Sequence, residues 1–367
     1  MVSDINEVKT ALSILTELAG SEELFDIHTH PFNVADSVPS YEKETSGRTG
    51  IFTRGYGHYV PPGLETEEFD ENVISTEDEK NGDVQFDQHL LKKFYLLKSR
   101  KTYNFTGPGV LIDNMALAGI KRALLLPVAR PEDEGDAQML EMERLFGEHQ
   151  NFLIGYCVPN DCKIDKIVQE VGRVRNRFKV AALKIHPNIT GIDPSSRGGL
   201  DRIHHILEAS KTYRLPVIIH GGYSREFSDG DAMNFGCLNR LVNVAWETTD
   251  QPVIIAHAGL FGCGREEILK SGLPQIMSLL IKHDHLLVDL AGLGQWTIQM
   301  IVKKLEPERI LFGSDALYFS IWRSAVFTLI ALMKTGLDAG QIFHRFAGIN
   351  PGRYIFRDQT KVTAGIS

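Results

Sequence analysis

Short apolar segments of strand length recur along most of the chain, and longer segments with helical periodicity separate them. The apolar segments are continuous rather than alternating, which is typical of strands buried on both faces, as in a parallel sheet. Eight strands are predicted, at 24–27, 122–127, 152–157, 180–185, 216–219, 252–256, 286–290 and 310–312. Helices are predicted between most of them, at 138–146, 164–175, 200–211, 238–246, 266–282, 297–305 and 321–334.

This alternation predicts an α/β fold, a (β/α)8 TIM barrel. Periodicity alone also permits an open doubly wound sheet, but no glycine-rich phosphate loop follows the first strand. Two segments lie outside the alternation. An amphipathic helix is predicted within 1–20, and 31–106 is far longer than an ordinary connection. We expect a single domain, 1–367, in which 31–106 is a cap or a dimerisation arm on the rim where active sites are built.

Composition and charge narrow the class of protein. The chain is 43% hydrophobic and 23% charged, which is typical of a globular protein. A net charge of -8 disfavours a nucleic-acid partner, and no apolar run approaches the roughly 20 residues that span a bilayer. The start of the chain lacks a secretory pattern, and four cysteines without C-x-x-C spacing suggest reduced thiols. We therefore expect a cytoplasmic protein without a nucleic-acid or membrane partner.

His28 and His30 lie at the carboxyl end of the first predicted strand. Side chains alternate along a strand, so both imidazoles and the nearby Asp26 should emerge on one face. Two neutral imidazoles at this separation can share a divalent cation such as zinc, iron, nickel or copper. The alternative is a polar strand end that carries two histidines by chance.

Other chemically active residues follow later predicted strands at the same end. In chain order they are Lys184, His186, His220, His257 and Asp315. The carboxyl ends of all strands converge on one face of a TIM barrel, where active sites are built. One histidine at a strand end is usually structural, whereas a set at equivalent ends of different strands indicates a site.

The segments that carry these residues resemble motifs of the amidohydrolase superfamily. LFDIHTH at 24–30 resembles its opening metal motif, and PVIIH at 216–220, VIIAHAG at 253–259 and ILFGSD at 310–315 resemble its fifth, sixth and eighth strand signatures. ALKIHP at 182–187 and FAGINP at 346–351 resemble the amidohydrolase-related branch. That branch includes lactonases, uncharacterised hydrolases and the aminocarboxymuconate-semialdehyde decarboxylase group. The resemblance covers the barrel but not 1–20 or 31–106.

The resemblance implies a metal site and a division of roles. The metal ligands would be His28, His30, His220 and Asp315, around one divalent ion, zinc. His257 would stand beside the metal as a proton shuttle or a donor to the substrate oxygen, and Asp315 would take a proton from water. In binuclear members of the superfamily, a lysine on the fourth strand is carboxylated and bridges two metals. The sequence context of Lys184 here favours an amine near the substrate and a single metal.

Three further residues are candidates for substrate binding. His186 shares the strand parity of Lys184, and Arg225 and Arg265 follow His220 and His257, where they could meet an anionic group. The resulting prediction is a hydrolase of an ester, lactone or amide in a small molecule. The alternatives are a nonoxidative decarboxylase or hydratase of a small carboxylic acid, and a metal-binding barrel without catalysis. The complete set of predicted ligands disfavours a barrel without catalysis. Members of the family are commonly dimers, so the resemblance implies a homodimer.

Overall fold

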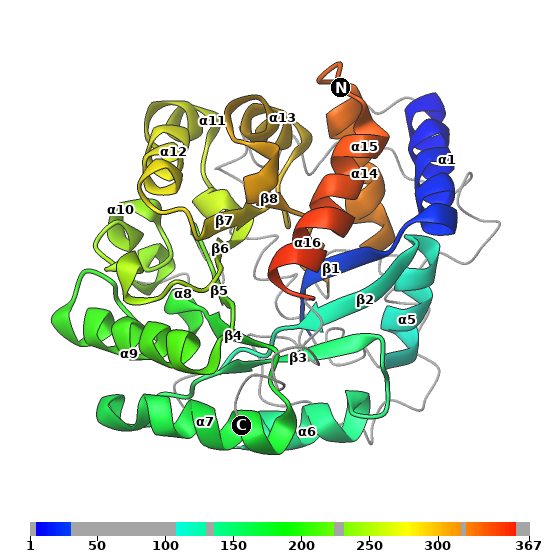
Figure 1. Ribbon diagram of the computed structural model, residues 1–367. Coiled ribbons are helices and arrows are strands. Elements are labelled where there is room, and N and C mark those ends of the chain that lie inside the picture. Colours follow the sequence, from blue (N-terminus) through cyan, green and yellow to red (C-terminus); the bar gives the residue numbers. More distant parts are fainter. Residues whose placement is uncertain (1–4, 31–107, 130–135, 224–230, 317–320, 357–367) are drawn as a thin grey trace, which may run out of the picture.

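Eight parallel strands form a barrel with helices on its outside in the computed structural model of the chain (Figure 1). The structure describes residues 5–30, 108–129, 136–223, 231–316 and 321–356. Each strand pairs with the next in chain order from β1 to β8. Backbone hydrogen bonds from Ile27 to Phe312, from His30 to Ala316 and from Asp315 to His28 then join the first strand to the last. The predicted TIM barrel is confirmed.

The predicted strands agree with the observed ones to within a few residues. The strands are β1 Leu24–Thr29, β2 Ile120–Leu125, β3 Phe152–Cys157, β4 Ala182–Ile185, β5 Val217–Ile219, β6 Val253–Ile255, β7 Leu286–Asp289 and β8 Ile310–Leu311. The helices are α1 Ile5–Ser21, α5 Pro108–Leu117, α6 Ala137–Phe146, α7 Ile167–Phe178, α8 Pro187–Thr190, α9 Arg197–Tyr213, α10 Leu238–Leu241, α11 Arg265–Glu267, α12 Leu273–Lys282, α13 Gln295–Lys304, α14 Ile321–Met333, α15 Ala339–His344 and α16 Asn350–Tyr354.

Two predicted helices are shorter or more irregular than expected. The helix predicted at 238–246 ends after a single turn, α10, because the chain then bends and buries Trp246 from a separate 3-10 turn. The helix predicted at 266–282 is interrupted by a π-helical turn, Ile268–Gly272. Pro274 lacks the N–H that would continue the hydrogen-bond ladder, and Gly272 packs closely on Leu260. Apolar periodicity therefore predicted correctly which segments are buried, but it did not predict their backbone conformation.

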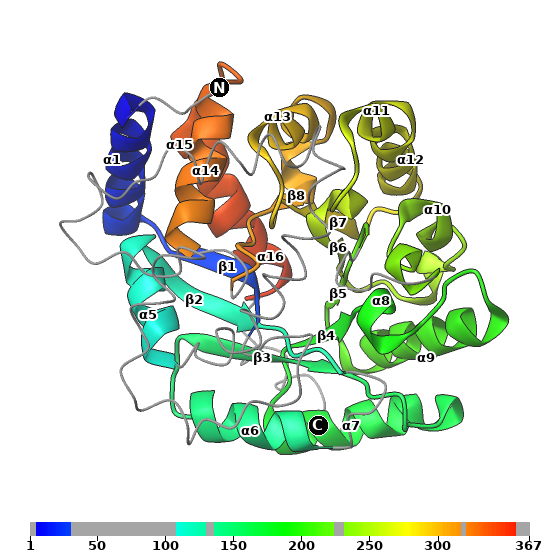
Figure 2. The same ribbon diagram turned by 180° about the vertical axis from the view of Figure 1, so that it is seen from behind.

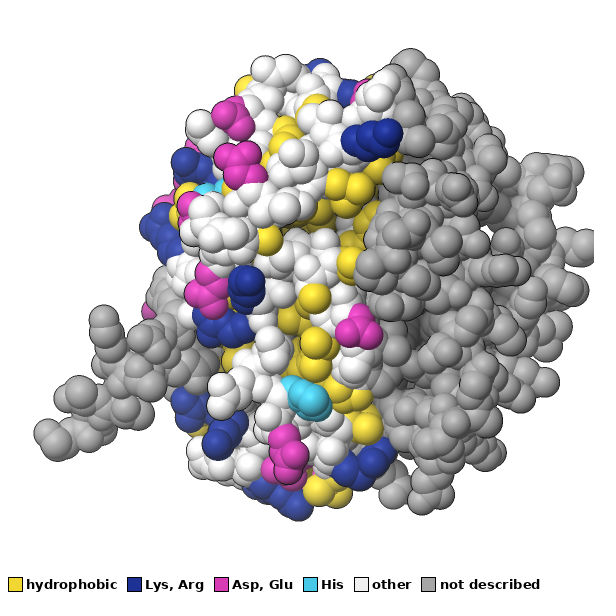
Figure 3. Space-filling model, turned by 90° about the vertical axis from the view of Figure 1, so that its right-hand side faces the viewer, with side chains coloured by type: hydrophobic (Ala, Val, Ile, Leu, Met, Phe, Trp, Pro, Cys, Tyr) yellow, Lys and Arg dark blue, Asp and Glu magenta, His cyan; other side chains and the backbone are white. Residues whose placement is uncertain are grey.

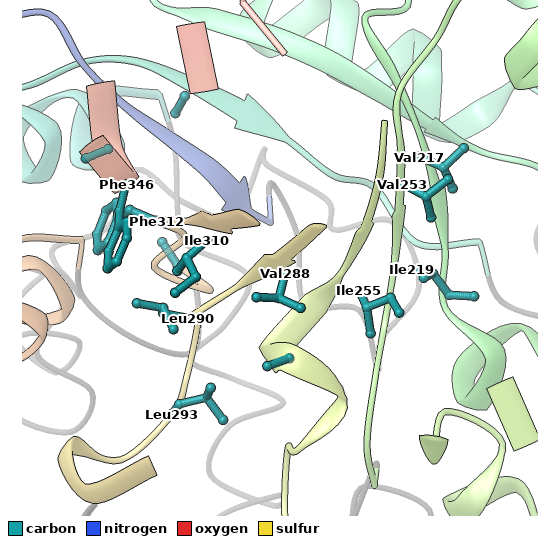
Figure 4. Packing of buried hydrophobic residues seen from close by; sticks show 14 of the residues in the cluster. Val217, Ile219, Val253, Ile255, Val288, Leu290, Leu293, Ile310, Phe312 and Phe346 are labelled. Atoms are coloured by element: carbon teal, nitrogen blue, oxygen red, sulfur yellow. The ribbon is translucent and has the colours of Figure 1, made fainter. Parts of the chain in front are cut away.

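Alternation along the strands divides the core into two layers. One set of side chains packs against the helices, as Figure 4 shows for Val217, Ile219, Val253, Ile255, Val288 and Ile310. The alternate residues belong to a separate cluster inside the barrel that includes Ala182, Ile218, Ile254, Leu287 and Leu311. Three polar residues come two positions after members of this inner cluster, at the carboxyl ends of their strands. They are Lys184, His220 and Asp289, and the same parity that fills the barrel therefore aims them at its mouth.

The opposite end of the barrel is closed by aromatic packing. The rings of Phe25 and Phe356 stack with centroids 4.3 Å apart, and the Arg122 guanidinium lies over both rings. Outside the barrel, the predicted N-terminal helix is present as α1, which packs against α14 and α15 (Figure 2). Lys334 and Glu7 form an ion pair of 3.4 Å across this contact.

Three sequence-based expectations concern the surface and the thiols. None of the four cysteines forms a disulfide. Charges of both signs are interspersed on the described part of the face in Figure 3, with no single basic patch there. None of the helices in the described ranges is long and apolar enough to cross a membrane. The predicted cap at 31–106 lies outside the described residues.

Candidate metal centre

His28 and His30 bring their imidazoles together at the end of β1, as their spacing predicts. Both side chains are buried, and the two Nε2 atoms are 3.2 Å apart. His30 Nδ1 donates to the carbonyl of Leu126 at 2.8 Å, and His28 Nδ1 lies 2.9 Å from a carboxylate oxygen of Asp289. Burial lowers the pKa of both histidines, that of His28 well below its usual range. Neutral rings with Nδ1–H leave both Nε2 lone pairs facing the centre.

His257 enters the site from an unusual backbone turn after β6. Its φ is 56°, and the next two residues, Ala258 and Gly259, are also left-handed, with φ of 50° and 72°. Its Nδ1 donates to the carbonyl of Ala291 at 2.7 Å, and its ring centre is 5.1 Å from that of His28. Because Nδ1 makes this hydrogen bond, Nε2 is the ring nitrogen of His257 that remains for a ligand or a proton.

Asp315 completes the cluster from the segment after β8, again with a left-handed backbone (φ 58°). Its Oδ1 is 3.2 Å from His30 Nε2 and 3.6 Å from His28 Nε2. Burial alone would raise the pKa of Asp315, but the neighbouring imidazoles, chiefly that of His30, outweigh it and hold the pKa below its usual range. Asp315 is therefore a carboxylate in the folded protein.

Lys184 lies against these acceptors. Its Nζ is 3.1 Å from His28 Nε2, and the side chain is buried. Burial lowers the pKa of Lys184 to about 8, against the opposing effect of the Asp315 and Asp289 carboxylates. The ammonium form donates a hydrogen bond to His28, which independently requires that His28 Nε2 is an acceptor.

His220 and His186 stack on each other beside the cluster, with ring centroids 4.1 Å apart and an interplanar angle of 10°. His220 also lies 4.9 Å from His257, ring centre to ring centre, and its buried Nε2 has no hydrogen-bond partner among the described residues. His186 differs in its protonation, because its Nδ1 accepts a hydrogen bond from the backbone N–H of Ile189. The neutral His186 therefore carries its proton on Nε2 and is a donor.

The cluster has the chemistry of a cation site. Potential ligand atoms of His28, His257 and Asp315 lie within 4.8 Å of one another. The acceptor atoms of His28, His30 and Asp315 are 3.2 to 3.6 Å apart, although lone pairs repel at such distances. Ligands about 2.1 Å from a metal lie roughly 3.0 to 3.4 Å from each other in tetrahedral or octahedral sites. The residues present therefore fit a divalent metal ion.

Of the two predicted arginines, the structure describes only Arg265, which is not part of this cluster. Arg265 is exposed, and its guanidinium lies 5.2 Å from the ring centre of Trp296. Arg225 lies outside the described residues. The described structure thus brings together six of the predicted residues around the barrel mouth, namely His28, His30, Lys184, His220, His257 and Asp315, with His186 stacked beside them.

Two buried acids support the cluster in ways that the sequence analysis did not assign. Asp26 Oδ1 accepts hydrogen bonds from the backbone N–H groups of His28 and Ser314, both at 3.0 Å, and so ties β1 to the end of β8. Burial raises the pKa of Asp26 to about 7. Asp289, the last residue of β7, contacts His28. The signal for Asp289 was an acid directly after the apolar run of the seventh strand, at the position equivalent to Lys184 and His220.

Comparison with known families identifies this arrangement. A family model described as Amidohydrolase matches residues 25–340. The chain belongs to the amidohydrolase family. A comparison of this amidohydrolase with curated proteins found no match.

Several solved structures share the fold of this amidohydrolase. IDCase from Metarhizium anisopliae has a TM-score of 0.54 at 13% identity, covering 92% of this chain and 98% of that chain. A putative amidohydrolase from Staphylococcus aureus has a TM-score of 0.53 at 13% identity, covering 71% and 95%. A 5-carboxyvanillate decarboxylase from Sphingomonas paucimobilis has a TM-score of 0.51 at 12% identity, covering 92% and 99%. At these identities the similarity establishes the barrel and not the reaction.

Proposed function

We propose that this amidohydrolase hydrolyses an ester, lactone or amide bond in a small, carboxylate-bearing molecule, with one divalent metal, zinc, as cofactor. The observation that carries the proposal is that acceptor atoms of His28, His30 and Asp315 lie within 3.6 Å of one another, with the His257 imidazole beside them. His28, His30, His220 and Asp315 would hold the metal. A divalent ion in such a site lowers the pKa of water from about 15.7 to about 7, which makes a nucleophile available at neutral pH.

Side chains around the ligands then have separate tasks. The Asp315 carboxylate would accept a proton of the attacking water, and His257 Nε2 would take up that proton and pass it to the leaving oxygen or nitrogen. The Lys184 ammonium and the His186 Nε2–H face the same region and bind a substrate carboxylate, which in turn favours the charged form of Lys184. Hydrolysis consumes one water, and the proton that Asp315 receives returns to the product.

Nonoxidative decarboxylation is the second candidate, and the position of Lys184 favours it. An ammonium 3.1 Å from His28 Nε2 could hold a carboxylate against the metal ligands. The carboxylate would leave as carbon dioxide while His257 or Asp315 delivers a proton to the carbon that loses it. A hydratase would use the same groups. Two solved structures with this fold are named as decarboxylases of 5-carboxyvanillate and 2,6-dihydroxybenzoate.

One assay separates these reactions. Metal-free protein is reconstituted with zinc, manganese or cobalt and incubated with panels of lactones, amides, esters and aromatic or unsaturated carboxylic acids. Mass spectrometry detects addition of water, and a coupled assay detects carbon dioxide. We expect metal-dependent turnover that Asp315→Asn abolishes and that Asp284→Asn, at the exposed amino end of β7, leaves intact. Turnover that survives both chelation and Asp315→Asn would refute a metal-dependent mechanism.

Several sequence-based expectations stay predictions alongside this function. They are the zinc identity, the homodimer, the cytoplasmic location, the substrate-binding roles of His186, Arg225 and Arg265, and the cap at 31–106.

A further inference from the structure

Asp289 at the carboxyl end of β7 touches two histidines that come from different strands. The side chain is fully buried. Its Oδ2 is 2.9 Å from His28 Nδ1, on β1. Its Oδ1 accepts the backbone N–H of His257, after β6, at 2.7 Å and that of Ala291 at 3.1 Å. The Asp289 carboxyl group therefore connects the His28 side chain on β1 with the backbone of His257 after β6.

The proton between Asp289 and His28 belongs to the imidazole. The Lys184 ammonium donates to His28 Nε2 at 3.1 Å, so that nitrogen is an acceptor and the ring hydrogen is on Nδ1. The two backbone N–H groups at Oδ1 can only donate. Asp289 thus receives three hydrogen bonds, one at Oδ2 and two at Oδ1.

The hydrogen bond from the His257 N–H to Asp289 stabilises a strained segment of backbone. His257 and Ala258 have φ of 56° and 50°, a left-handed region that disfavours residues with a Cβ. The His257 N–H is bonded to Asp289, and the His257 ring is bonded to Ala291 O at 2.7 Å. The segment from Asp289 to Ala291 therefore holds both the backbone and the ring of His257 in the orientation that faces the metal cluster.

We propose that Asp289 is a positioning residue for the metal centre, which fixes the Nδ1–H tautomer of His28 and the left-handed turn of His257. A strand that contributes no ligand to the proposed set thereby sets the direction of two imidazoles. The inference rests on the proposed metal centre and not on whether the reaction is hydrolysis or decarboxylation. A carboxylate partner of this kind orients a ligand histidine and raises its basicity.

The test is Asp289→Asn in the full chain, with Asp284→Asn as the matched control. The asparagine oxygen can still accept from the two backbone N–H groups, but its NH2 would face His28 Nδ1, which must then become an acceptor. Asp284 lies two residues before β7, is fully exposed, and loses the same charge. Metal affinity is measured by titrating cobalt or zinc into metal-free protein against a chromophoric chelator. The His28 tautomer is read from long-range ¹H–¹⁵N spectra of the metal-free protein, assigned with His28→Gln.

We expect Asp289→Asn to weaken metal binding about 10- to 100-fold and to move the His28 proton to Nε2, while Asp284→Asn changes neither. A lower melting temperature with unchanged metal affinity and tautomer would reduce Asp289 to a structural residue and overturn the proposal. The wild-type spectrum tests it even if the variant does not fold, because an Nε2–H form of His28 in the wild type also overturns it. Failure of the wild type to bind metal would instead refute the metal centre itself.

Discussion

Gly236 lies against the imidazole of His220, so Gly236→Ala tests whether that imidazole is a metal ligand. A Cβ at this position would lie 2.6 Å from Gly222 O, 2.7 Å from Asn188 Oδ1 and 3.0 Å from His220 Cδ2. All three distances are below the roughly 3.5 Å of an ordinary heavy-atom contact. The Gly222 carbonyl is backbone, and the Asn188 amide donates to the carbonyls of Ala232 and Met233. The group that can move is therefore the His220 ring.

Overpacking of this kind costs about 1–3 kcal/mol. By turning His220 away, the metal-free protein can relieve the part of this cost that comes from the His220 contact, whereas a metal that needs the ring must restore that contact. That part of the free energy then appears as weaker metal binding, with an upper limit of roughly 5- to 150-fold if the whole cost were relieved, at about 1.4 kcal/mol per tenfold. The measurement is a competition titration of metal-free protein against a chromophoric chelator. Gly198→Ala is the control, because nothing lies within 4 Å of a Cβ at that position.

Unchanged metal affinity in Gly236→Ala, together with a lower melting temperature, would refute the reasoning. It would show that His220 need not occupy its observed position when metal binds, and His220 would leave the ligand set. Equal weakening in Gly198→Ala would point to a general effect of glycine replacement and would be equally damaging.

Three further predictions concern stability. Phe356→Ala removes the ring stacked on Phe25 and should lower the free energy of unfolding in urea by about 3–5 kcal/mol without altering metal affinity. Lys184→Met should stabilise the metal-free protein below pH 8 by about 3 kcal/mol, because burial lowers the pKa of Lys184 from 10.5 to about 8. That gain should shrink as the pH rises from 8 to 10.5 and vanish above it; destabilisation at pH 7 would contradict it. Burial also lowers the pKa of His285 below 6.5, so the unfolded chain takes up a proton more readily and wild-type stability should fall as the pH drops below about 6.5. His285→Gln should flatten that fall in thermal unfolding curves, and an unchanged slope would exclude His285 as its source.

Sequence periodicity was sufficient to predict the barrel and to predict where half of the candidate site residues lie. The spacing of His28 and His30 on a strand determines that their rings meet, and parity places Lys184 and His220 at the same end. It could not reveal how His257 and Asp315 are aimed, because both depend on left-handed backbone that no pattern of apolar residues encodes. Asp289 was overlooked for a related reason, since its importance lies in a hydrogen bond to a residue 261 positions away.

The substrate-binding role of Arg265 stays a prediction. Arg265 was singled out because it follows His257 closely in sequence, yet the structure engages its guanidinium with Trp296 at an exposed position.

The junction between the first and last strands has a consequence for how the protein is made. β8 is only two residues long, and the seam is held by backbone bonds to β1 together with the Asp26 carboxylate, which accepts from Ser314. His28 and His30 leave the ribosome early, whereas their partner Asp315 is synthesised nearly 300 residues later. Domains emerge at about 5–20 residues per second, so the two histidines wait many seconds before the ring can close around them. A metal held by this set would therefore be fully coordinated only after the final strand has been made.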